Sequence, residues 1–382
     1  MSNTLTGLIQ YVYDSVDVVS REQVGLIPAV YKNTKADMVA KDQSITYDVV
    51  PVASGYDIAP SNAIPELDSS TVGTGTMSIS KVRGTKFHWT GEDEVAIGRA
   101  AKDGIQNNKF AQAFRTLTGE MEADLAALYA RASRAYGTAG TAPFGTAGDF
   151  TDAAAVLKIL KDNGAPLSDL NLVINTAAGV NLIGKQSQVH MVGSGDPLRQ
   201  GILLDIAGFK IRESAAIKQH TKGAGTGYDF IAAGEAVGQT TLSVEGGTVN
   251  TTGIKAGDVI THAGDTVNKY IVTTGLTATS GDIVIAQPGL LVAGADANEL
   301  TVGDSYAANM AFSRDAIHLL TRLPLMPEGG DQADDIMIVQ DPVSGIFFQV
   351  AMYKAYRAVL IEVAVAWGVK AAKPNHMALL LG

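Results

Sequence analysis

The feature that most constrains the fold is a long apolar stripe in the first third of the chain. Its members recur every three or four residues, which is the repeat of one helix face: Phe110, Phe114, Leu117, Met121, Leu125 and Leu128. We expect one helix from about Asn107 to Ala135, with Gly137 as its stop and a length of roughly 40–45 Å. The stripe covers only about three heptads, so we favour a helix lying across a sheet over a coiled-coil seam.

Residues 4–30 have the pattern of an arm that lies on another surface. Apolar residues recur there at spacings that suit short amphipathic helices, and Pro28 ends the pattern: Leu8, Tyr11, Val18, Val24 and Ile27. The apolar run is interrupted every few positions by Asp14, Asp17, Arg21 and Glu22. A secretory signal needs an uninterrupted apolar core behind basic residues, so a targeting sequence is not indicated.

Two runs of alternating apolar and polar residues predict a projecting β-hairpin. The first run is 44–51 (SITYDVVP), and the second covers 76–82 and continues to 86–89. The residues between them are rich in Gly, Pro and Ser, as expected for a loop. Such a long excursion inside a compact domain is usually functional, and a mobile surface lid is the alternative interpretation.

The stretch 138–235 begins with a Gly/Ala/Thr linker at 138–149 and then alternates helices and strands. A helix is expected over 151–163, with Thr151 or Asp152 as its cap and Gly164 as its stop. The elements expected after it are a strand over 170–175, a helix over 176–185, and strands within 202–211 broken at Gly208. This alternation predicts a compact mixed α/β unit.

Between Gly238 and Gly303 the helical period disappears. Short β-rich runs are divided by Gly, Asp and Asn turns at spacings of about ten residues: TTLSVEG, DVITHAG, KYIVTTG, DIVIAQ and ELTVGD. This pattern predicts a small antiparallel barrel or sandwich. A carbohydrate-binding β-module has the same pattern, so these residues alone do not decide a function.

Composition bounds the class of protein. The 382 residues include 41 glycines, 18% charged residues and no cysteine, which suits strands and close subunit packing and excludes disulfides and thiolate metal sites. The net charge is −10, and the sequence contains no cluster of Lys and Arg residues. Binding to nucleic-acid phosphates is therefore not indicated. No apolar run approaches the ~20 residues of a membrane span. The longest, 359–369, is interrupted by Glu362 and Gly368 and predicts a strand, as does the run beginning at Phe347.

Several stretches carry a resemblance to a known family, in order along the chain. They are the arm, the long helix, the segment GIKAGDVITHAG in the β-rich region, and the C-terminal blocks 308–327 and 341–374, the second of which contains Trp367-Gly368-Val369. Together they resemble the major capsid proteins of tailed bacteriophages. Within that family the chain most resembles the coat proteins of short-tailed phages that carry an extra β-domain.

The resemblance implies an α+β chain with the Hong Kong 97 type capsid fold and an inserted small β-barrel, with the long helix as its spine helix. The parts would be an N-terminal arm (1–43), an extended loop built as a β-hairpin (44–95), a peripheral domain with the spine helix (96–137), a mixed α/β axial domain (138–235), the inserted barrel (236–306), and C-terminal strands completing the axial and peripheral domains (307–382).

No set of residues indicates catalysis, cofactor binding or a metal site. The histidines are scattered and form no close helical pair: His88, His190, His220, His262, His318 and His376. His88, beside Trp89, is interpreted as a strand residue at a packing surface. The glycine runs 193–195 and 223–227 lack the strand, helix and lysine of a phosphate loop, and Ser344 lacks the spacing of a nucleophile elbow.

The acidic run Glu92-Asp93-Glu94 is interpreted as a solvated charge cluster rather than a divalent-cation site. In the capsid interpretation it lies near the base of the extended loop, where it could pair with Lys or Arg of a neighbouring subunit. No motif marks a covalent Lys–Asn crosslink. We therefore expect no enzyme activity and no catalytic, cofactor-binding or metal-binding residue.

The function implied by the resemblance is that of a major capsid protein. Many copies would form hexamers and pentamers that close into an icosahedral head around double-stranded phage DNA, without sequence-specific binding and without a membrane. The chain begins at the arm, so the expected scaffolding protein is a separate one. A portal protein is a further expected partner, and a decoration protein is an optional one. The expected location is the virion, assembled in the host bacterial cytoplasm. The alternatives are an encapsulin-like compartment shell and a glycan-binding β-module protein.

Overall fold

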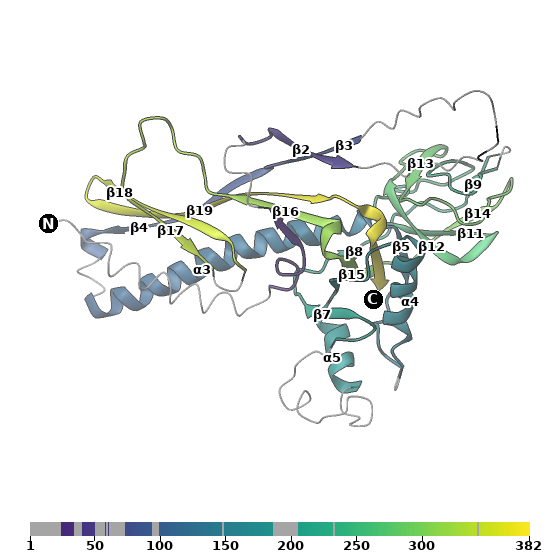
Figure 1. The fold of residues 1–382 in the computed structure, drawn as a ribbon, viewed down its shortest axis with the longest axis horizontal. Helices are drawn as coiled ribbons and strands as arrows, with labels where there is room; N and C mark the ends of the chain where they lie inside the picture. Colours follow the sequence, from purple (N-terminus) through teal and green to yellow (C-terminus); the bar gives the residue numbers. More distant parts are fainter. Residues whose placement is uncertain are drawn as a thin grey trace.

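The computed structural model describes residues 24–33, 40–49, 58, 60, 73–93, 99–146, 149–185, 205–231, 234–341 and 344–382. Figure 1 shows an elongated molecule, with a long sheet and a long helix in one half and two lobes at the other end. Most of the expected arm and most of the tip of the expected hairpin lie outside the described residues. Within the described residues, no helix is long and apolar enough to cross a membrane.

The long half of the molecule is a six-stranded sheet with the helix α3 (Arg99–Ala126) along one face (Figure 1). Its strands are β1 (Tyr31–Asn33), β4 (Lys81–Thr90), β16 (Ile317–Arg322), β17 (Ala333–Gln340), β18 (Phe347–Ala355) and β19 (Ala358–Ala371). The central strand is β19, which pairs with β4 along one edge and with β18 and then β16 along the other. Strand β1 joins the outside of β16 in parallel orientation.

The apolar stripe of α3 is the face that packs on this sheet. Phe110, Phe114, Leu117, Met121 and Leu125 are each at most 2% exposed. They share one core with alternate residues of β19, as the period of two in a strand requires: Ile361, Val363, Val365 and Trp367. The expectation of a helix lying across a sheet is confirmed.

The helix ends earlier than its sequence pattern predicts. It stops at Ala126, the 3-10 turn η1 (Ala127–Arg131) follows, and strand β5 (Arg134–Tyr136) occupies the place of the expected last turn. This strand pairs with β12 (Asp265–Thr274) on one side and with β20 (Met377–Leu381) on the other. The predicted end at Ala135 was wrong because hydrogen bonds to distant strands outweigh a local helix propensity of a few tenths of a kcal/mol.

The lower lobe in Figure 1 is a mixed α/β unit. Its strands run in the order β5, β20, β15 (Tyr306–Ser313), β6 (Leu170–Ile174) and β7 (Phe209–Glu213), with β8 (Gln219–His220) continuing the β6 edge of β15. Helices α4 (Thr151–Asp162) and α5 (Thr176–Lys185) pack against one face of this sheet. The opposite face belongs to the same core as α3.

Helix α4 begins with a different cap from the one we expected. Phe150 occupies the N-cap position without a side-chain hydrogen bond. The backbone N–H of Thr151 donates to the Asp149 carboxylate at 2.7 Å, and the Asp152 carboxylate accepts the backbone N–H of Phe144 at 2.7 Å. Neither Thr151 nor Asp152 is therefore the cap, because both are already inside the first turn. Gly164 follows the helix with a φ of +73°, as expected of a stop.

The upper lobe is a closed six-stranded barrel, which resolves the choice between barrel and sandwich. Its strands are β9 (Tyr228–Phe230), β10 (Thr241–Glu245), β11 (Val259–His262), β12, β13 (Gly281–Ile285) and β14 (Glu299–Val302). They close antiparallel in the order β11, β14, β9, β10, β13, β12 and back to β11. The barrel includes β9, which precedes the expected start of the barrel at residue 236. Strand β12 of the barrel also pairs with β5 of the neighbouring lobe.

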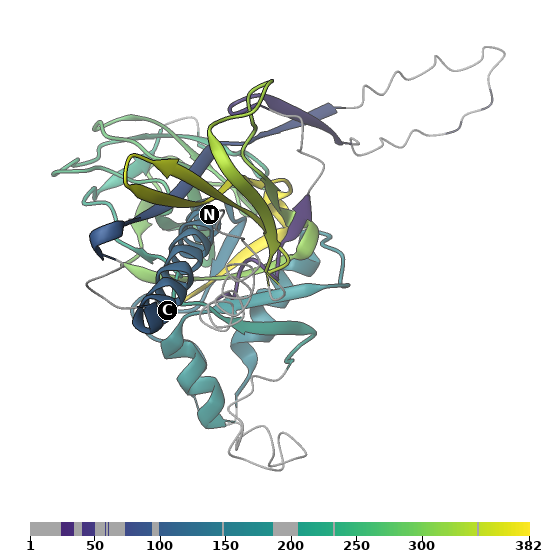
Figure 2. The same ribbon diagram turned by 90° about the vertical axis from the view of Figure 1, so that its left-hand side faces the viewer.

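The expected hairpin is present as two antiparallel strands, β2 (Ser44–Val49) and β3 (Gly73–Ser78). Figure 2 shows it standing out from the body above the six-stranded sheet. The C-terminal residues contribute to both sheets, since β15 and β20 belong to the lobe and β16 to β19 to the long half.

Candidate assembly surfaces

The last part of the arm is fixed to α3 by a buried carboxylate. Glu122 on α3 is 2% exposed, and its carboxylate accepts the backbone N–H groups of Leu26 at 2.9 Å and Ile27 at 2.8 Å and the Ser214 hydroxyl at 2.9 Å. Burial raises the pKa of Glu122, although these hydrogen bonds oppose the shift. A Cβ at Gly25 would lie 2.5 Å from the carbonyl oxygen of Glu213, so the arm passes where only glycine fits.

The base of the hairpin sits on the face of the sheet that α3 does not cover. Met77 and Ile79 form a separate small core there with Leu320 and Ala366. A Cβ at Gly368 would lie 1.9 Å from the carbonyl oxygen of Ser78, so the hairpin approaches the sheet at backbone distance. The direction in which the hairpin leaves the body is therefore set by packing.

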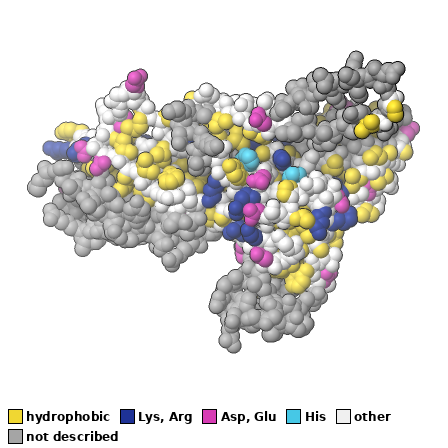
Figure 3. Space-filling view, viewed as in Figure 1, with side chains coloured by type: hydrophobic (Ala, Val, Ile, Leu, Met, Phe, Trp, Pro, Cys, Tyr) yellow, Lys and Arg dark blue, Asp and Glu magenta, His cyan; other side chains and the backbone are white. Residues whose placement is uncertain are grey.

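Beyond the hairpin base lies an open face, which is the outer part of the same sheet face over β17 and the start of β18. Ile336 and Ile338 of β17 are 37% and 56% exposed, and Phe347 of β18 is 40% exposed. Figure 3 shows hydrophobic side chains gathered over β4 and β17 to β19 at the left of the view. Toward the centre of the sheet, Ala351 and Ala364 are buried and share a pocket with Pro324 and Pro327 of the segment that precedes β17. Exposed apolar residues along one side of a sheet suit contact with another protein segment.

A buried polar chain joins the barrel to the rest of the molecule. The Tyr129 hydroxyl lies 2.8 Å from Nδ1 of His220, and Nε2 of His220 lies 2.7 Å from Oδ1 of Asp258. Asp258 also accepts the backbone N–H of Gly223 at 3.0 Å and of Lys255 at 2.7 Å. His220 is 4% exposed and Asp258 is 1% exposed, so a substrate has no access to them. This hydrogen-bonded series therefore serves to position the barrel.

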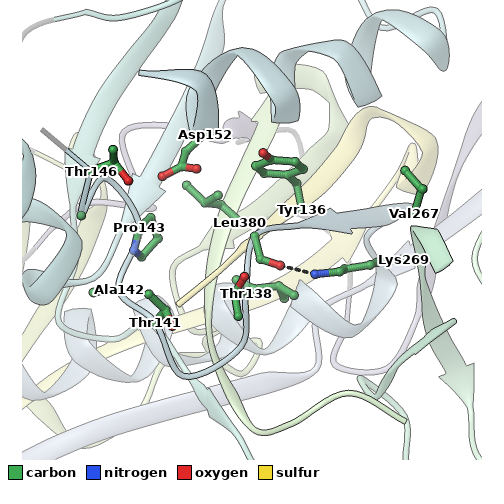
Figure 4. A pocket seen from close by; sticks show the side chains of 13 residues that line it. Tyr136, Thr138, Thr141, Ala142, Pro143, Thr146, Asp152, Val267, Lys269 and Leu380 are labelled. Atoms are coloured by element: carbon green, nitrogen blue, oxygen red, sulfur yellow. Dashed lines mark hydrogen bonds between the residues drawn. The ribbon is translucent and has the colours of Figure 1, made fainter. Parts of the chain in front are cut away.

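A cleft of about 460 Å³ lies between β12 of the barrel and the linker that follows β5 (Figure 4). Its polar groups bond to the backbone around it. Nζ of Lys269 donates to the carbonyl of Gly137, and the Asp152 carboxylate accepts the N–H of Phe144. Burial lowers the pKa of Lys269. The cleft is therefore a seam between the barrel and the linker, with its charged groups held by backbone partners.

No family model and no curated protein matches the chain. Among solved structures, it is similar to a chain of the capsid of the cyanophage P-SCSP1u, with a TM-score of 0.51, 13% identity, and coverage of 94% of this chain and 88% of that one. The chain has a Hong Kong 97 type capsid fold. Similarity extends to a chain of Mycobacterium phage Che8, with a TM-score of 0.49, 14% identity, and coverage of 94% and 91%. It also extends to a virus-like particle from Pyrococcus furiosus, with a TM-score of 0.41, 10% identity, and coverage of 97% and 98%.

Within the capsid fold the histidines remain dispersed, and His190 lies outside the described residues. His88 lies on β4, His262 in the barrel, and His318 on β16 near the rings of Tyr31 and Tyr47. Across the described ranges, no group of three His, Asp or Glu residues is placed to hold a metal ion.

The acidic run caps a helical turn. The Asp93 carboxylate accepts the hydroxyl of Thr90 at 2.6 Å and its backbone N–H at 3.1 Å, while the Thr90 hydroxyl accepts the N–H of Asp93 at 3.2 Å. These bonds lower the pKa of Asp93. Such a reciprocal pair is a capping box at the start of a helix. Glu94 lies outside the described residues.

The glycine run at 223–227 serves close backbone packing at the base of the barrel. A Cβ at Gly223 would lie 2.2 Å from the carbonyl oxygen of Gly253, and Gly227 has a φ of +67°. Ser344 is buried in the turn before β18, where its hydroxyl accepts the N–H of Ile346 at 3.3 Å. The run at 193–195 lies outside the described residues.

Two structural sites were missed by the sequence analysis: the Glu122 anchor and the His220–Asp258 pair. Glu122 stands off the apolar stripe of α3, which is the pattern of a solvated residue. Residues distant in the chain bury it, namely Leu26 and Ile27 of the arm and Ser214 after β7. A lone glutamate in a helix carries no signal of such a partner.

Proposed function

We propose that this chain is a major capsid protein whose copies assemble into hexamers and pentamers and close an icosahedral head around double-stranded DNA. The observation that carries the proposal is the capsid fold, whose match covers 94% of this chain. It is supported by three features: the end of an arm pinned to α3, a hairpin whose base packs on the sheet while its strands stand out from the body, and the exposed apolar residues of the open face.

The mechanism is assembly by burial of surface between subunits. The hairpin of one copy would lie over the open face of its neighbour, covering Ile336, Ile338 and Phe347. Obligate interfaces bury about 2,000 Å² or more each. At roughly 25 cal/mol per Å² of apolar surface, many individually weak contacts therefore stabilise a closed shell.

Further partners belong to the proposal. A separate scaffolding protein and a portal protein would act with the shell, with a decoration protein as an optional further partner. Assembly would take place in the host cytoplasm, and the product would be the virion. With a net charge of −10, the chain would confine DNA without gripping it. We propose no enzymatic role.

The test is purification of the chain with and without a candidate scaffolding protein, followed by negative-stain electron microscopy. Uniform closed shells or capsomers are expected. Persistent monomers in the presence of the scaffold would contradict the proposal. Analysis of what shells formed in cells contain distinguishes a phage head from an encapsulin-like compartment. DNA together with a portal indicates a phage head, and a cargo enzyme indicates an encapsulin-like compartment.

A glycan-binding role has less support in the barrel. Its exposed large hydrophobic residues among the described residues are aliphatic: Val237, Val267, Leu291 and Val292. Its tyrosines Tyr228 and Tyr270 are buried inside the ring. Binding of a sugar ring usually uses an exposed aromatic face, so the barrel is better interpreted as a structural domain.

A further inference from the structure

Three cations from distant parts of the sequence gather where the long half of the molecule meets the α/β lobe. Lys32 lies on β1, Arg212 on β7, and Arg314 begins the 3-10 turn η2 (Arg314–Ala316) between β15 and β16. The charges of Arg314 and Arg212 both act on Lys32, and that of Arg314 acts on Arg212. In Figure 3, Lys and Arg side chains with a few carboxylates among them gather near the middle of the face, in the region of β1 and β7.

The two arginines are incompletely paired in the single chain. Nε of Arg212 and Nε of Arg314 are both buried and meet no acceptor among the described residues. The nearest ion pair of Arg314 is to Asp169 at 3.9 Å, and the other oxygen of that carboxylate is held by Lys210 at 2.7 Å. Burial and the charge of Arg314 lower the pKa of Arg212, and the opposing charge of Asp205 does not offset them. The two neighbouring guanidinium groups therefore keep hydrogen-bonding capacity that a further anion can use.

Lys32 is better satisfied than the arginines. Its Nζ donates to the carbonyl of Ser344, and the charge of Asp341 favours its ammonium form. Lys32 therefore adds positive potential beside the arginines, while the unfilled hydrogen-bonding capacity lies on Arg212 and Arg314.

We propose that Arg212 and Arg314, with Lys32 beside them, bind a carboxylate side chain of a second copy of this chain. The inference rests on the proposed function, because it assigns one contact between subunits of the shell. A guanidinium fork matches a carboxylate through two parallel hydrogen bonds, which a lysine cannot do. The chain holds 39 acidic and 29 basic residues, so every copy carries surplus carboxylates.

The position of the cluster also favours a neighbouring subunit. Strand β7 is the terminal strand of its sheet. Ile206 and Gly25 of the same chain lie against parts of its outer edge. The Arg314 side chain is nevertheless 37% exposed and Arg212 is half-buried, so a second copy can reach the cluster. A nucleic-acid backbone fits less well, because it requires a continuous basic stripe. Here Asp169, Asp205 and Asp341 stand among the cations and would repel successive phosphates.

The first test compares two double variants with equal loss of charge. Arg212→Gln/Arg314→Gln removes the anion site, and Lys158→Gln/Lys222→Gln removes two exposed cations that pair with Asp162 and Asp304. Sedimentation velocity gives the subunit concentration at which half the chain is assembled. We expect it to rise at least about tenfold for the arginine variant, because truncating one partner of a buried charge pair is costly, and to stay within about twofold for the control.

The outcomes separate this inference from the proposed function. A wild-type chain that never assembles would overturn the proposed function and, with it, the inference. A wild-type chain that assembles, together with an arginine variant that matches the control, would overturn the inference alone. The melting temperature of the isolated subunit is measured in parallel. It should not fall in the arginine variant, since the two cations repel each other there; a fall that accounts for the lost assembly would overturn the inference.

The second test identifies the carboxylate. In Arg212→Lys, a carbodiimide joins the introduced amine to a touching carboxylate as an amide with loss of water, and peptide mass spectrometry locates the link. We expect a link between two copies in assembled material, absent below the assembly concentration. Links only to Asp205, Asp169 or Asp341 of the same chain would overturn the proposal. So would binding of a short DNA duplex that Arg212→Gln/Arg314→Gln abolishes.

Discussion

At the scale of single residues, Glu122 fixes the last residues of the arm, around Leu26 and Ile27. Its carboxylate accepts hydrogen bonds from the backbone N–H groups of Leu26 and Ile27 and from the Ser214 hydroxyl. None of these three partners is a cation. Because burial raises its pKa, the folded chain keeps a proton on Glu122 at pH values where the unfolded chain has lost it. The contribution of this side chain to stability therefore falls as pH rises from the ordinary carboxyl value of 4.5 through the raised value.

We predict that Glu122→Gln removes this pH dependence. Relative to wild type, the variant should gain stability as pH rises above the ordinary carboxyl pKa, since the amide has no proton to lose. Urea unfolding of the subunit between pH 4 and pH 8 measures the difference, and Glu328→Gln, at an exposed position, is the control. Parallel stability curves for wild type and Glu122→Gln would contradict the prediction.

Glu122→Ala should act differently, because it leaves the buried N–H groups of Leu26 and Ile27 without an acceptor. A buried donor left unpaired costs about 1–3 kcal/mol. We expect the arm to detach before the rest of the subunit unfolds, and limited proteolysis near residue 25 to become faster. Cleavage as slow as in Glu122→Gln would show that the carboxylate is not the anchor.

At the scale of elements, two glycines of the long half should respond in opposite ways to alanine. A Cβ at Gly119 of α3 meets nothing within 4 Å, whereas a Cβ at Gly368 of β19 would lie 1.9 Å from the carbonyl oxygen of Ser78. We predict that Gly119→Ala stabilises the subunit by up to about 1 kcal/mol through helix propensity. Gly368→Ala should destabilise it by roughly 1–3 kcal/mol, because the hairpin base must move. Equilibrium unfolding checks both, and equal effects would refute the packing described for β3.

The outer surface of the barrel carries an unfavourable row of like charges. Asp229 of β9 stands directly opposite Glu245 of β10 and Glu299 of β14. Like charges opposite each other across strands are destabilising by a few tenths of a kcal/mol to about 1 kcal/mol. Asp229→Asn should therefore raise the melting temperature, most at low salt. Asp282→Asn is the control, since Asp282 accepts a hydrogen bond from Ser243 at 2.7 Å and should not gain.

At the scale of the whole molecule, the open sheet face should matter for assembly and little for the subunit. Ile338 is 56% exposed on that face, and Val267 is 83% exposed on the barrel. We predict that Ile338→Lys changes subunit stability by less than about 0.5 kcal/mol but prevents closed shells. The control variant Val267→Lys should form closed shells. Electron microscopy of both variants with the scaffolding partner tests this prediction. Normal shells from Ile338→Lys would show that the open face takes no part in assembly.

Much of the architecture follows from local patterns. The stripe from Phe110 to Leu125 predicts the buried side of α3, and the alternation of 44–47 predicts the side of β2 that faces the body, because side chains on one face recur with the period of the element. Gly164 has the positive φ expected of a helix stop, and each β-rich run between Gly238 and Gly303 became a barrel strand. These signals are local in the chain, so sequence alone was enough to predict them.

What the sequence by itself determined is the type and order of most elements, and through its family resemblance the fold. Only the tertiary structure decided where α3 ends, since Arg134 and Ala135 bond to strands far away in the chain. It alone closed the barrel through β9, buried Glu122 under the arm and brought Arg212 to Arg314. The physical reason is common to all of these: pairing, burial and charge repulsion depend on partners that the chain supplies only after it has folded.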